Sequence, residues 1–475
     1  MPTPFRILLV NAIGTHSWME RRQAMLGLGY LAAGVRRAIP GTPFEFRVIE
    51  ENVPQAAEQF KPQLAGISFV SQNTPIALRY AEEFERRRIP VVMGGAHISV
   101  LPRCLPRSAL AACLGEGEQT FAELVQTVMG GKTDGQTLKT IPGIAYWEGA
   151  TFVQNADRPC LADLDTLPFP DRSLFPIYTH TPIFTSRGCP YRCAFCASTR
   201  FWDKVRFHSA DYIAAEIELL ARQYGVNFIS LYDDLFIARL ERIETLIRLL
   251  EKRGLLNRIG FSCNCRANLV NRNLAALLVR LGVKYVTMGL ESGDDQILRY
   301  LKGDNVTVAQ NREAVRILRE HGLKVNAYFI IGAPRETGAQ IMNTYNFIRQ
   351  NKPDLVEVNI LTPFPGTPVW EYAKGRNLVA EESFDWTKLN TCICGPADKF
   401  ILISEVLTHD AFVGFYKKMR RLQFRRNLLG ICRHPMLSDI ARMLINIIAQ
   451  YCRQWLRLAA RPRPMAAEKP APDPV

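Results

Sequence analysis

The sequence has no uninterrupted run of eighteen or more apolar residues, so nothing in it requires a helix that spans a membrane. Its twelve cysteines are too sparse among 475 residues to form a disulfide scaffold. The apolar stretch at residues 4–12 is short and no small-residue cleavage site follows it, which favours a buried strand over a secretion signal. We therefore expect a cytoplasmic protein of about two or three domains.

Positive charge is concentrated near the C-terminus. The net charge is +14, and residues 417–463 carry twelve Lys or Arg residues against one acidic residue, Asp439. The basicity therefore has to be explained in that segment, because the rest of the chain is close to neutral. Residues 440–457 place apolar side chains at helical spacing with arginines elsewhere. Such a helix either packs on the protein or lies on an anionic membrane surface.

The first 150 residues alternate short apolar runs with helical patterns, which is typical of an α/β domain with a parallel, Rossmann-like sheet. Two glycine-bearing turns, at residues 94–97 and 115–118, follow expected strands. Ligands of such sheets bind at the carboxyl ends of the strands, where these turns lie. Strands are expected at residues 6–10, 46–49, 64–69 and 91–93, and helices at residues 25–35 and 76–87.

The remaining chain divides into four parts. Residues 151–178 are the expected linker, because residues 164–172 combine prolines and turn-forming Asp without periodicity. Residues 179–376 resume the alternation and predict a partial (β/α)6 TIM-type barrel. Residues 377–462 are the helical basic C-terminal region, and the Pro/Ala-rich residues 463–475 are expected to be disordered. The barrel strands are expected at residues 183–186, 228–232, 260–263, 285–290, 325–331 and 356–361.

Three of the cysteines, Cys189, Cys193 and Cys196, lie within eight residues directly after an expected strand. Thiolates at this spacing can bind one compact metal centre from a single loop, and a cubane iron–sulfur cluster with three cysteine ligands keeps one iron open. Arg187 and Arg192 are expected to offset part of the thiolate charge. The sequence therefore predicts an iron–sulfur site with a free coordination position.

The alternative for these cysteines is a zinc knuckle. Structural zinc needs a closed set of four ligands. No histidine lies within the loop, so a fourth ligand could come from Cys263 or Cys265 only through a long-range contact. The iron–sulfur interpretation needs no such contact and is preferred.

The CxxxCxxC spacing, with Phe195 directly before the last cysteine, closely resembles the signature of the radical S-adenosylmethionine (SAM) superfamily. The resemblance implies that the three cysteines bind a [4Fe–4S] cluster, that SAM chelates the open iron, and that reductive cleavage of SAM gives a 5′-deoxyadenosyl radical. The cofactor then carries the difficult chemistry while the protein orients and shields it. By the same resemblance, the residues expected at the SAM site are Phe195, Asp233 or its neighbour Asp234, Arg266, Glu291 and Ser292. Each acid could instead be a helix cap or a structural ion-pair partner.

The first domain resembles the cobalamin-binding domain that precedes the barrel in one large branch of this superfamily. The matching segments are residues 27–33, 66–68, 94–97 and 115–118, followed by the connector at residues 164–172. The resemblance implies cobalamin contacts from Ser68, Gly94, Gly95, Gly115 and Glu116. The sequence lacks the Asp-x-His-x-x-Gly loop through which other cobalamin proteins ligate cobalt, so His97 is expected to be a capping or packed histidine.

The leading functional hypothesis is a cobalamin-dependent radical SAM methyltransferase that acts on an unactivated carbon. A cyclase or rearrangement enzyme of the same branch would share these motifs. An RNA methylthiotransferase would carry a second N-terminal cysteine cluster, whereas only Cys104 and Cys113 occur there. A non-catalytic metal protein that binds nucleic acid through its basic tail would need aromatic residues interleaved with the basic ones, and these are few.

The expected partners follow from these hypotheses. A small-molecule substrate is expected, hydrophobic or lipid-like if the C-terminal helix makes a peripheral membrane contact at the inner face. The resemblance implies an electron donor such as flavodoxin or ferredoxin. Nucleic acid is not expected, because the charge follows one helical region rather than a groove.

Overall fold

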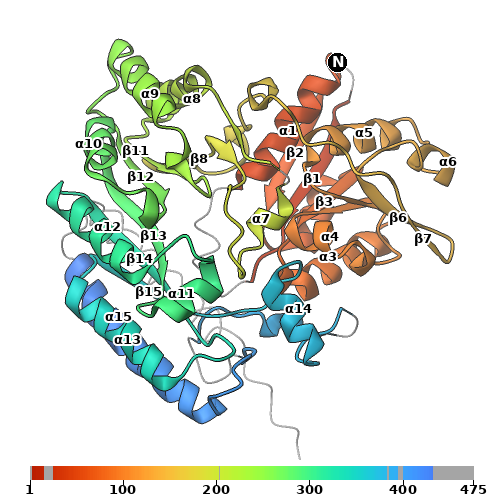
Figure 1. The fold of residues 1–475 in the computed structure, drawn as a ribbon. Helices are drawn as coiled ribbons and strands as arrows, with labels where there is room; N and C mark the ends of the chain where they lie inside the picture. The colour runs from red at the N-terminus through yellow and green to blue at the C-terminus, as the bar shows by residue number, and fades with distance from the viewer. Residues whose placement is uncertain (1–2, 15–24, 203, 382–383, 394–398, 432–475) are drawn as a thin grey trace, which may run out of the picture.

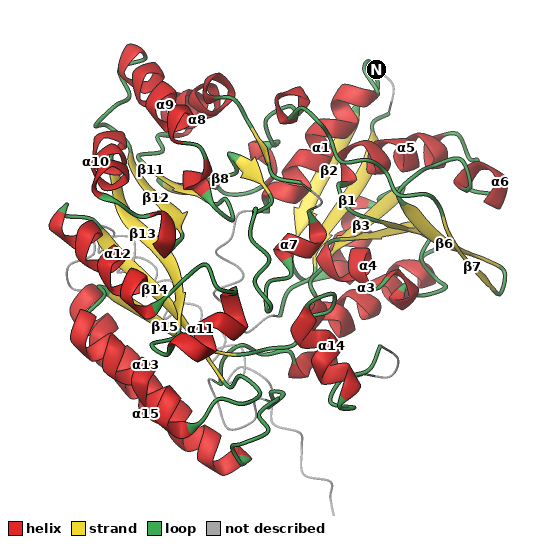
Figure 2. Cartoon of the chain, in the orientation of Figure 1, coloured by secondary structure: helices red, strands yellow, loops and turns green. Residues whose placement is uncertain are grey.

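The computed structural model describes residues 3–14, 25–202, 204–381, 384–393 and 399–431. Figure 1 shows two sheets, an N-terminal one on the right and a second one on the left, with the remaining helices around them. Figure 2 shows that α8, α9, α10, α12, α13 and α15 lie on the side of the left sheet that faces away from the N-terminal half. The predicted α/β fold class, with a cobalamin-binding-type domain before a partial barrel, is confirmed.

The N-terminal sheet has seven strands in the order β2-β1-β3-β4-β5-β6-β7. The first five strands in this order are parallel, and β6 and β7 add an antiparallel hairpin. The strand order reverses between β1 and β3, and ligands of doubly wound sheets bind outside the carboxyl ends of the strands at such a switch point. The strands are β1 (Phe5–Asn11), β2 (Phe44–Ile49), β3 (Leu64–Ser68), β4 (Val91–Gly94), β5 (Ala111–Cys113), β6 (Ile144–Glu148) and β7 (Thr151–Gln154).

The N-terminal sheet is covered on both faces because its central strands are apolar on both faces. In β1, Leu8 and Val10 belong to one buried cluster and Ile7 and Leu9 to another. All four side chains are fully buried, as expected of a strand with helices on either side. The helices of this half are α1 (Leu26–Ala38), α2 (Val53–Phe60), α3 (Thr74–Arg86), α4 (Ala96–Val100), α5 (Gly117–Met129) and α6 (Gly135–Leu138).

The second sheet has six parallel strands in chain order, which is the predicted partial (β/α)6 barrel. Its outward-facing side chains pack with the helices into the largest buried cluster of the described chain. The inward-facing positions, such as Ser230 and Ser262, carry polar side chains. The strands are β8 (His180–Ile183), β11 (Phe228–Leu231), β12 (Gly260–Cys265), β13 (Val283–Glu291), β14 (Lys324–Ile331) and β15 (Leu355–Ile360). The main helices are α8 (Ala210–Tyr224), α9 (Leu240–Lys252), α10 (Arg272–Leu281), α11 (Asp295–Lys302), α12 (Val308–Glu320) and α13 (Gly338–Asn351).

The first barrel strand differs from its predicted position at residues 183–186. Strand β8 ends at Ile183, and the chain then bends into the short strand β9 (Ser186–Arg187), which pairs antiparallel with β10 (Arg206–Phe207). The bend arises because the backbone N–H groups of Thr185 and Ser186 donate to the Asp233 carboxylate instead of to a neighbouring strand. Periodicity alone does not predict this side-chain partner.

The C-terminal region closes the open edge of the barrel. It contains α14 (Pro368–Gly375), the single-turn η8 (Trp386–Lys388) and α15 (His409–Ile431). On α15, Asn427 accepts a hydrogen bond from the Val356 N–H at 2.8 Å and Gln423 accepts one from the Val358 N–H at 3.1 Å. Each such bond contributes about 1 kcal/mol and protects an edge strand that would otherwise expose its backbone.

The basic helix predicted at residues 440–457 and the tail at residues 463–475 lie outside the described residues. Within the described part of the chain, no helix is both long and apolar enough to cross a membrane.

Candidate cofactor site

Cys189, Cys193 and Cys196 lie on the loop that leaves strand β9. Gly188 turns the chain into this loop with a φ of 87°, and a Cβ atom there would lie 2.8 Å from the Lys204 carbonyl oxygen. Only glycine fits this turn without strain. Cys193 is buried and the other two thiols are partly exposed. The loop is tied to the opposite side of the barrel by the Ala194 N–H, which donates to the Leu301 carbonyl at 2.8 Å.

The thiols of this loop interact electrostatically. Burial raises the pKa of Cys189 to about 11, a hydrogen bond from the Tyr191 backbone opposes the rise, and Asp234 and the other two thiols add to it. Arg266 donates a hydrogen bond to Cys193 Sγ at 3.3 Å, and its guanidinium lies 3.8 Å from the centre of the Tyr191 ring. A guanidinium favours the thiolate form that binds iron. Three thiols with one such cation fit a three-cysteine iron–sulfur site.

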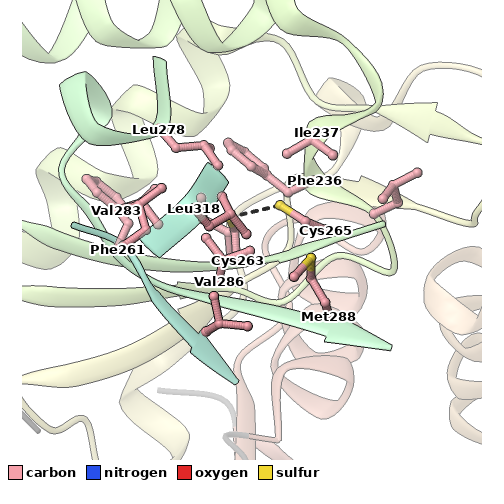
Figure 3. Close-up of a cluster of buried hydrophobic side chains, with 14 of the residues drawn as sticks. Phe236, Ile237, Phe261, Cys263, Cys265, Leu278, Val283, Val286, Met288 and Leu318 are labelled. Atoms are coloured by element: carbon pink, nitrogen blue, oxygen red, sulfur yellow. Dashed lines mark hydrogen bonds between the residues drawn. The ribbon is translucent and has the colours of Figure 1, made fainter. Parts of the chain in front are cut away.

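The two cysteines considered as further zinc ligands lie in the hydrophobic core. Figure 3 shows Cys263 and Cys265 on strand β12 among Phe236, Leu278 and Met288, with their Sγ atoms 3.9 Å apart. Among the described residues, no three His, Cys, Asp or Glu side chains form a group that could hold a single metal ion. A closed zinc site is therefore not formed, whereas a cubane holds its cysteine ligands farther apart than one ion does.

Arg187 does not neutralise the thiolates as expected. Its guanidinium donates to Glu116 at 2.6 Å and to Glu118 at 2.5 Å, both from the N-terminal half. Burial alone would lower the pKa of Arg187, but the two carboxylates raise it above its usual value. Arg192, the other cation expected to offset the thiolate charge, is exposed. Arg266 contacts the cluster loop in their place.

Of the two candidate aspartates, the structure gives Asp233 a structural role. Its carboxylate accepts hydrogen bonds from the Thr185 and Ser186 N–H groups at 2.6 and 3.0 Å and lies 3.7 Å from Arg242. Burial raises the pKa of Asp233, and Arg242 opposes that rise. Asp234, by contrast, lines a mostly apolar cavity and is available to a ligand.

Glu291 and Ser292 end strand β13 in a strained turn. Glu291 has a φ of 61°, and its carboxylate lies 3.6 Å from Lys302 Nζ, a buried lysine on α11. Burial raises the pKa of Glu291, while Lys302 and Arg266 lower it. Ser292 is fully buried and shares a 3.1 Å hydrogen bond with Thr344, so its hydroxyl is structural rather than free for SAM.

Phe195 lies beside the last cysteine and packs on a hydrophobic cluster next to the barrel. That cluster includes Ile297 and Leu301 of α11 and Trp370 of α14. The aromatic ring therefore anchors the end of the cysteine loop. Arg266 contacts this loop directly at Cys193, whereas Glu291 pairs with Lys302 of α11, the helix whose Leu301 carbonyl binds the loop.

A cavity of about 340 Å³ lies between the carboxyl ends of β3, β4 and β5 and the barrel segments that flank the cysteine loop. All five positions predicted to contact cobalamin line it: Ser68, Gly94, Gly95, Gly115 and Glu116. From the barrel side, Arg187, Trp202 and Asp234 complete the wall. A second cavity of about 500 Å³ shares Ser68, Phe184 and Tyr232 with the first. Cofactor sites typically have this mostly apolar lining with a few polar groups.

The first cavity contains polar atoms that suit a ligand with amide side chains. Glu118 Oε2 and Ser186 Oγ are buried and have no hydrogen-bond partner within the described chain, and both residues line the cavity. Unpaired buried polar atoms are costly, so a ligand with hydrogen-bonding groups would stabilise them. Cobalamin, which carries primary amides around its ring, fits this chemistry.

His97 does not face this cavity. Its ring packs against Trp386 with centroids 4.5 Å apart, and Nδ1 is hydrogen-bonded to Ser71 Oγ at 2.9 Å. His97 is therefore a packed histidine, as expected from the sequence. Burial lowers the pKa of His97 to about 4.

Sequence reasoning did not single out several residues that the fold brings to the site. Lys302, Arg206 and Trp202 lie on segments without a recognisable motif, and Tyr30 lies in the matched segment at residues 27–33 but was not named as a site residue. Lys302 and Arg206 are buried charges, and their partners lie on other elements of the fold. A buried Lys or Arg cannot be distinguished from a surface one by its local sequence.

Comparisons with known proteins agree with this site. The family model described as the radical SAM superfamily matches residues 183–348, and the model described as the B12 binding domain matches residues 24–125. The chain therefore belongs to the radical SAM superfamily, in the branch that also carries a B12-binding domain. It is an enzyme whose cofactors are a [4Fe–4S] cluster, SAM and cobalamin.

Individual relatives span nearly all of the chain. An uncharacterized methyltransferase of Pyrococcus horikoshii is 30% identical over 417 residues, covering 84% of this chain and 88% of that protein. The anaerobic magnesium-protoporphyrin IX monomethyl ester cyclase of Cereibacter sphaeroides is 26% identical, covering 84% of this chain and 68% of that protein. Among solved structures, the radical SAM methyltransferase TsrM of Kitasatospora setae is similar in fold, with a TM-score of 0.66 at 20% identity. The match covers 79% of this chain and 77% of TsrM.

Proposed function

We propose that this enzyme transfers a methyl group to an unactivated carbon of a small molecule. The observation that carries the proposal is that one wall of the cavity is formed by Arg187 and Trp202, which lie just before and just after the cysteine loop in the chain. When bound, the cluster and SAM supply a 5′-deoxyadenosyl radical, and cobalamin supplies a transferable methyl group. A cobalamin cavity next to the ends of the cysteine loop supports a reaction in which the SAM-derived radical and cobalamin act on one substrate.

The residues of this chain would hold and shield these cofactors. Cys189, Cys193 and Cys196 would bind the cluster, and Arg266 would remain beside it as a counter-charge. Burial raises the pKa of Glu291 and Lys302 opposes that rise, and the Glu291 carboxylate would accept a hydrogen bond from an ammonium group. The apolar lining of the cavity would keep water from a reactive radical.

The second cavity supports a small-molecule substrate with both apolar and hydrogen-bonding groups. Its lining combines Phe69 and Phe184 with Asn11 and His180. His180 Nε2 is hydrogen-bonded to Ser230 Oγ at 2.8 Å, which continues to Ser262 Oγ at 2.9 Å. Such a polar chain on the inner face of the barrel favours a ligand that can pair with it.

The first test is anaerobic reconstitution with iron, sulfide and hydroxocobalamin, followed by an absorption spectrum after unbound cofactor is removed. We expect both iron–sulfur and cobalamin bands in the wild type, and loss of the iron–sulfur band in the Cys189/Cys193/Cys196→Ala variant. The matched control is a Cys263/Cys265→Ala variant, whose thiols lie in the core and should not change iron content. A cluster without cobalamin would refute the methyl-transfer proposal.

A cyclase reaction is the second candidate, and the similarity to the Cereibacter sphaeroides cyclase supports it. The two reactions differ in the fate of the SAM methyl group. With SAM labelled in that methyl group, and flavodoxin or ferredoxin as electron donor, a methyltransferase transfers the label to its product. A cyclase product would carry no label.

We also propose a peripheral contact with anionic membranes through α15. The described end of this helix exposes Phe424 and Leu428, at 69% and 55%, beside the exposed basic residues Arg421 and Arg425. Apolar side chains between basic ones match an anionic lipid surface. Sedimentation with phosphatidylglycerol vesicles at low salt tests this, with phosphatidylcholine vesicles as the control. The proposal is wrong if the wild type and an F424S/L428S variant sediment equally.

A further inference from the structure

A buried group of four charges joins the cysteine loop to the N-terminal half. Arg187 of β9 and Arg206 of β10 are paired across a two-stranded ladder, and Glu116 and Glu118 at the start of α5 face them. Arg187 contacts Glu116 at 2.6 Å and Glu118 at 2.5 Å, and Arg206 contacts Glu116 at 2.8 Å. Each of the four side chains is 9% exposed or less. Two positive charges are therefore balanced by two negative ones out of water.

This group also reaches the connector between the two halves. Glu116 accepts a hydrogen bond from the Leu161 N–H at 2.7 Å, and Arg206 donates one to the Leu161 carbonyl at 2.7 Å. The Arg187 guanidinium lies 5.6 Å from the centre of the Tyr30 ring and 5.5 Å from that of Trp202. Planar bidentate contacts and ring stacking are properties of Arg that Lys does not share. The geometry therefore restricts how the two halves can sit relative to each other at this point.

The two ends of the group lie at two different cofactor sites. Arg187 is two residues before Cys189, the first cysteine of the loop. Glu118 uses one carboxylate oxygen for Arg187, and its other oxygen is buried, unpartnered and part of a residue that lines the cavity. One side chain thus touches both the strand that leads into the cysteine loop and the space assigned to cobalamin. A surface ion pair would not need this arrangement, and would contribute little to stability.

We propose that Glu118 and Arg187 are positioning residues that fix the cobalamin cavity against the cysteine loop, with the free Glu118 oxygen accepting a hydrogen bond from a cobalamin amide. The proposal rests on the proposed function for the identity of the ligand. Buried ion pairs often add little net stability but are costly to break, and fixing a unique geometry is one reason they are retained. Here the geometry being fixed is that between two cofactors that act on one substrate.

A second buried ion pair in the chain provides a matched control. Arg172 and Glu216 lie 2.6 Å apart with side chains 2% and 1% exposed, and they tie the connector to α8. Neither residue lines the cavity, although Glu216 also has an unpartnered oxygen. Glu118→Gln and Glu216→Gln therefore make the same chemical change in a buried ion pair, and only the first lies at the cavity.

The experiment compares these two variants in the reconstituted protein. The readouts are thermal unfolding, the dissociation constant of hydroxocobalamin by absorption titration, and hydrogen–deuterium exchange of the peptide at residues 184–190 without cobalamin. We expect both variants to lower the unfolding temperature. Only E118Q should weaken hydroxocobalamin binding tenfold or more and speed exchange of that peptide. Arg187→Lys keeps the charge but loses one carboxylate contact. Its hydroxocobalamin affinity and its exchange rate should lie between those of the wild type and of Arg187→Gln.

Two results would overturn the positioning role: unchanged cobalamin affinity and exchange in E118Q, or equal losses in E118Q and E216Q. If even the wild type fails to bind hydroxocobalamin, the proposed function fails on its own. The exchange comparison, made without cobalamin, then still decides whether Glu118 and Arg187 fix the loop.

Discussion

Asp233 and Asp234 are neighbours in the chain, but their carboxylates lie in different environments. Asp233 is 1% exposed and accepts hydrogen bonds from Thr185 and Ser186 beside Arg242. Asp234 is exposed in the cavity and accepts one from the Ser198 hydroxyl at 2.6 Å. The first carboxylate therefore shapes the turn before the cysteine loop, while the second can contact a ligand.

Asp233→Asn should destabilise the fold and Asp234→Asn should not. Loss of the Asp233 charge leaves Arg242 buried without its counter-ion and weakens two backbone contacts, which together cost about 2–4 kcal/mol. Asp234→Asn should stay within about 0.5 kcal/mol of the wild type, because the side chain is exposed. Urea unfolding of the protein without cofactors measures both. Equal stabilities would show that the Asp233 contacts do not hold the turn.

The sheets could be predicted from sequence because hydrophobic patterning is local. The apolar run at residues 7–10 lies between Arg6 and Asn11, the run at residues 91–93 lies between Pro90 and Gly94, and both are strands. The three cysteines were identified because their spacing alone brings them to one loop. In the same way, the glycine turns at residues 94–97 and 115–118 follow strands in the sequence and meet at one sheet edge in the fold.

The remaining features depend on partners distant in the chain. Arg187 was expected to face the thiolates, but Glu116 and Glu118 lie about seventy residues earlier and compete for it. The end of β8 was misplaced because the Asp233 carboxylate, 48 residues after Thr185, takes the backbone groups that would extend the strand. Burial converts such charged side chains from surface residues into structural ones, and periodicity carries no information about which ones.

Gly95→Ala should be far more disruptive than Gly94→Ala. Gly95 has a φ of 101°, and a Cβ atom would lie 2.5 Å from the Phe69 carbonyl oxygen. A Cβ on Gly94 would meet nothing closer than 3.8 Å. Backbone strain of this kind costs about 1–3 kcal/mol before the clash is counted. Thermal unfolding of both variants without cofactors tests this, and a G95A variant as stable as G94A would contradict the geometry.

Acid should weaken the packing of the C-terminal region on the N-terminal sheet through His97. Burial lowers the pKa of His97 from 6.5 to about 4, so the folded protein holds the ring neutral between Ser71 and Trp386. The unfolded chain binds the proton at higher pH, and the neutral ring's contribution is therefore present above pH 6.5 and lost as the pH falls towards 4. Between pH 7 and pH 5 the contribution of His97 to the free energy of unfolding falls by about 2 kcal/mol.

His97→Gln removes this titration while keeping a side chain that can bond to Ser71. We expect the wild type to exceed H97Q in unfolding free energy at pH 7, and the difference to shrink by about 2 kcal/mol at pH 5. Guanidinium unfolding at both pH values, followed by tryptophan fluorescence, measures it. A difference that does not change with pH would mean that His97 is protonated or solvated in the folded protein. The packing of His97 on Trp386 would then not be what holds η8 against α4.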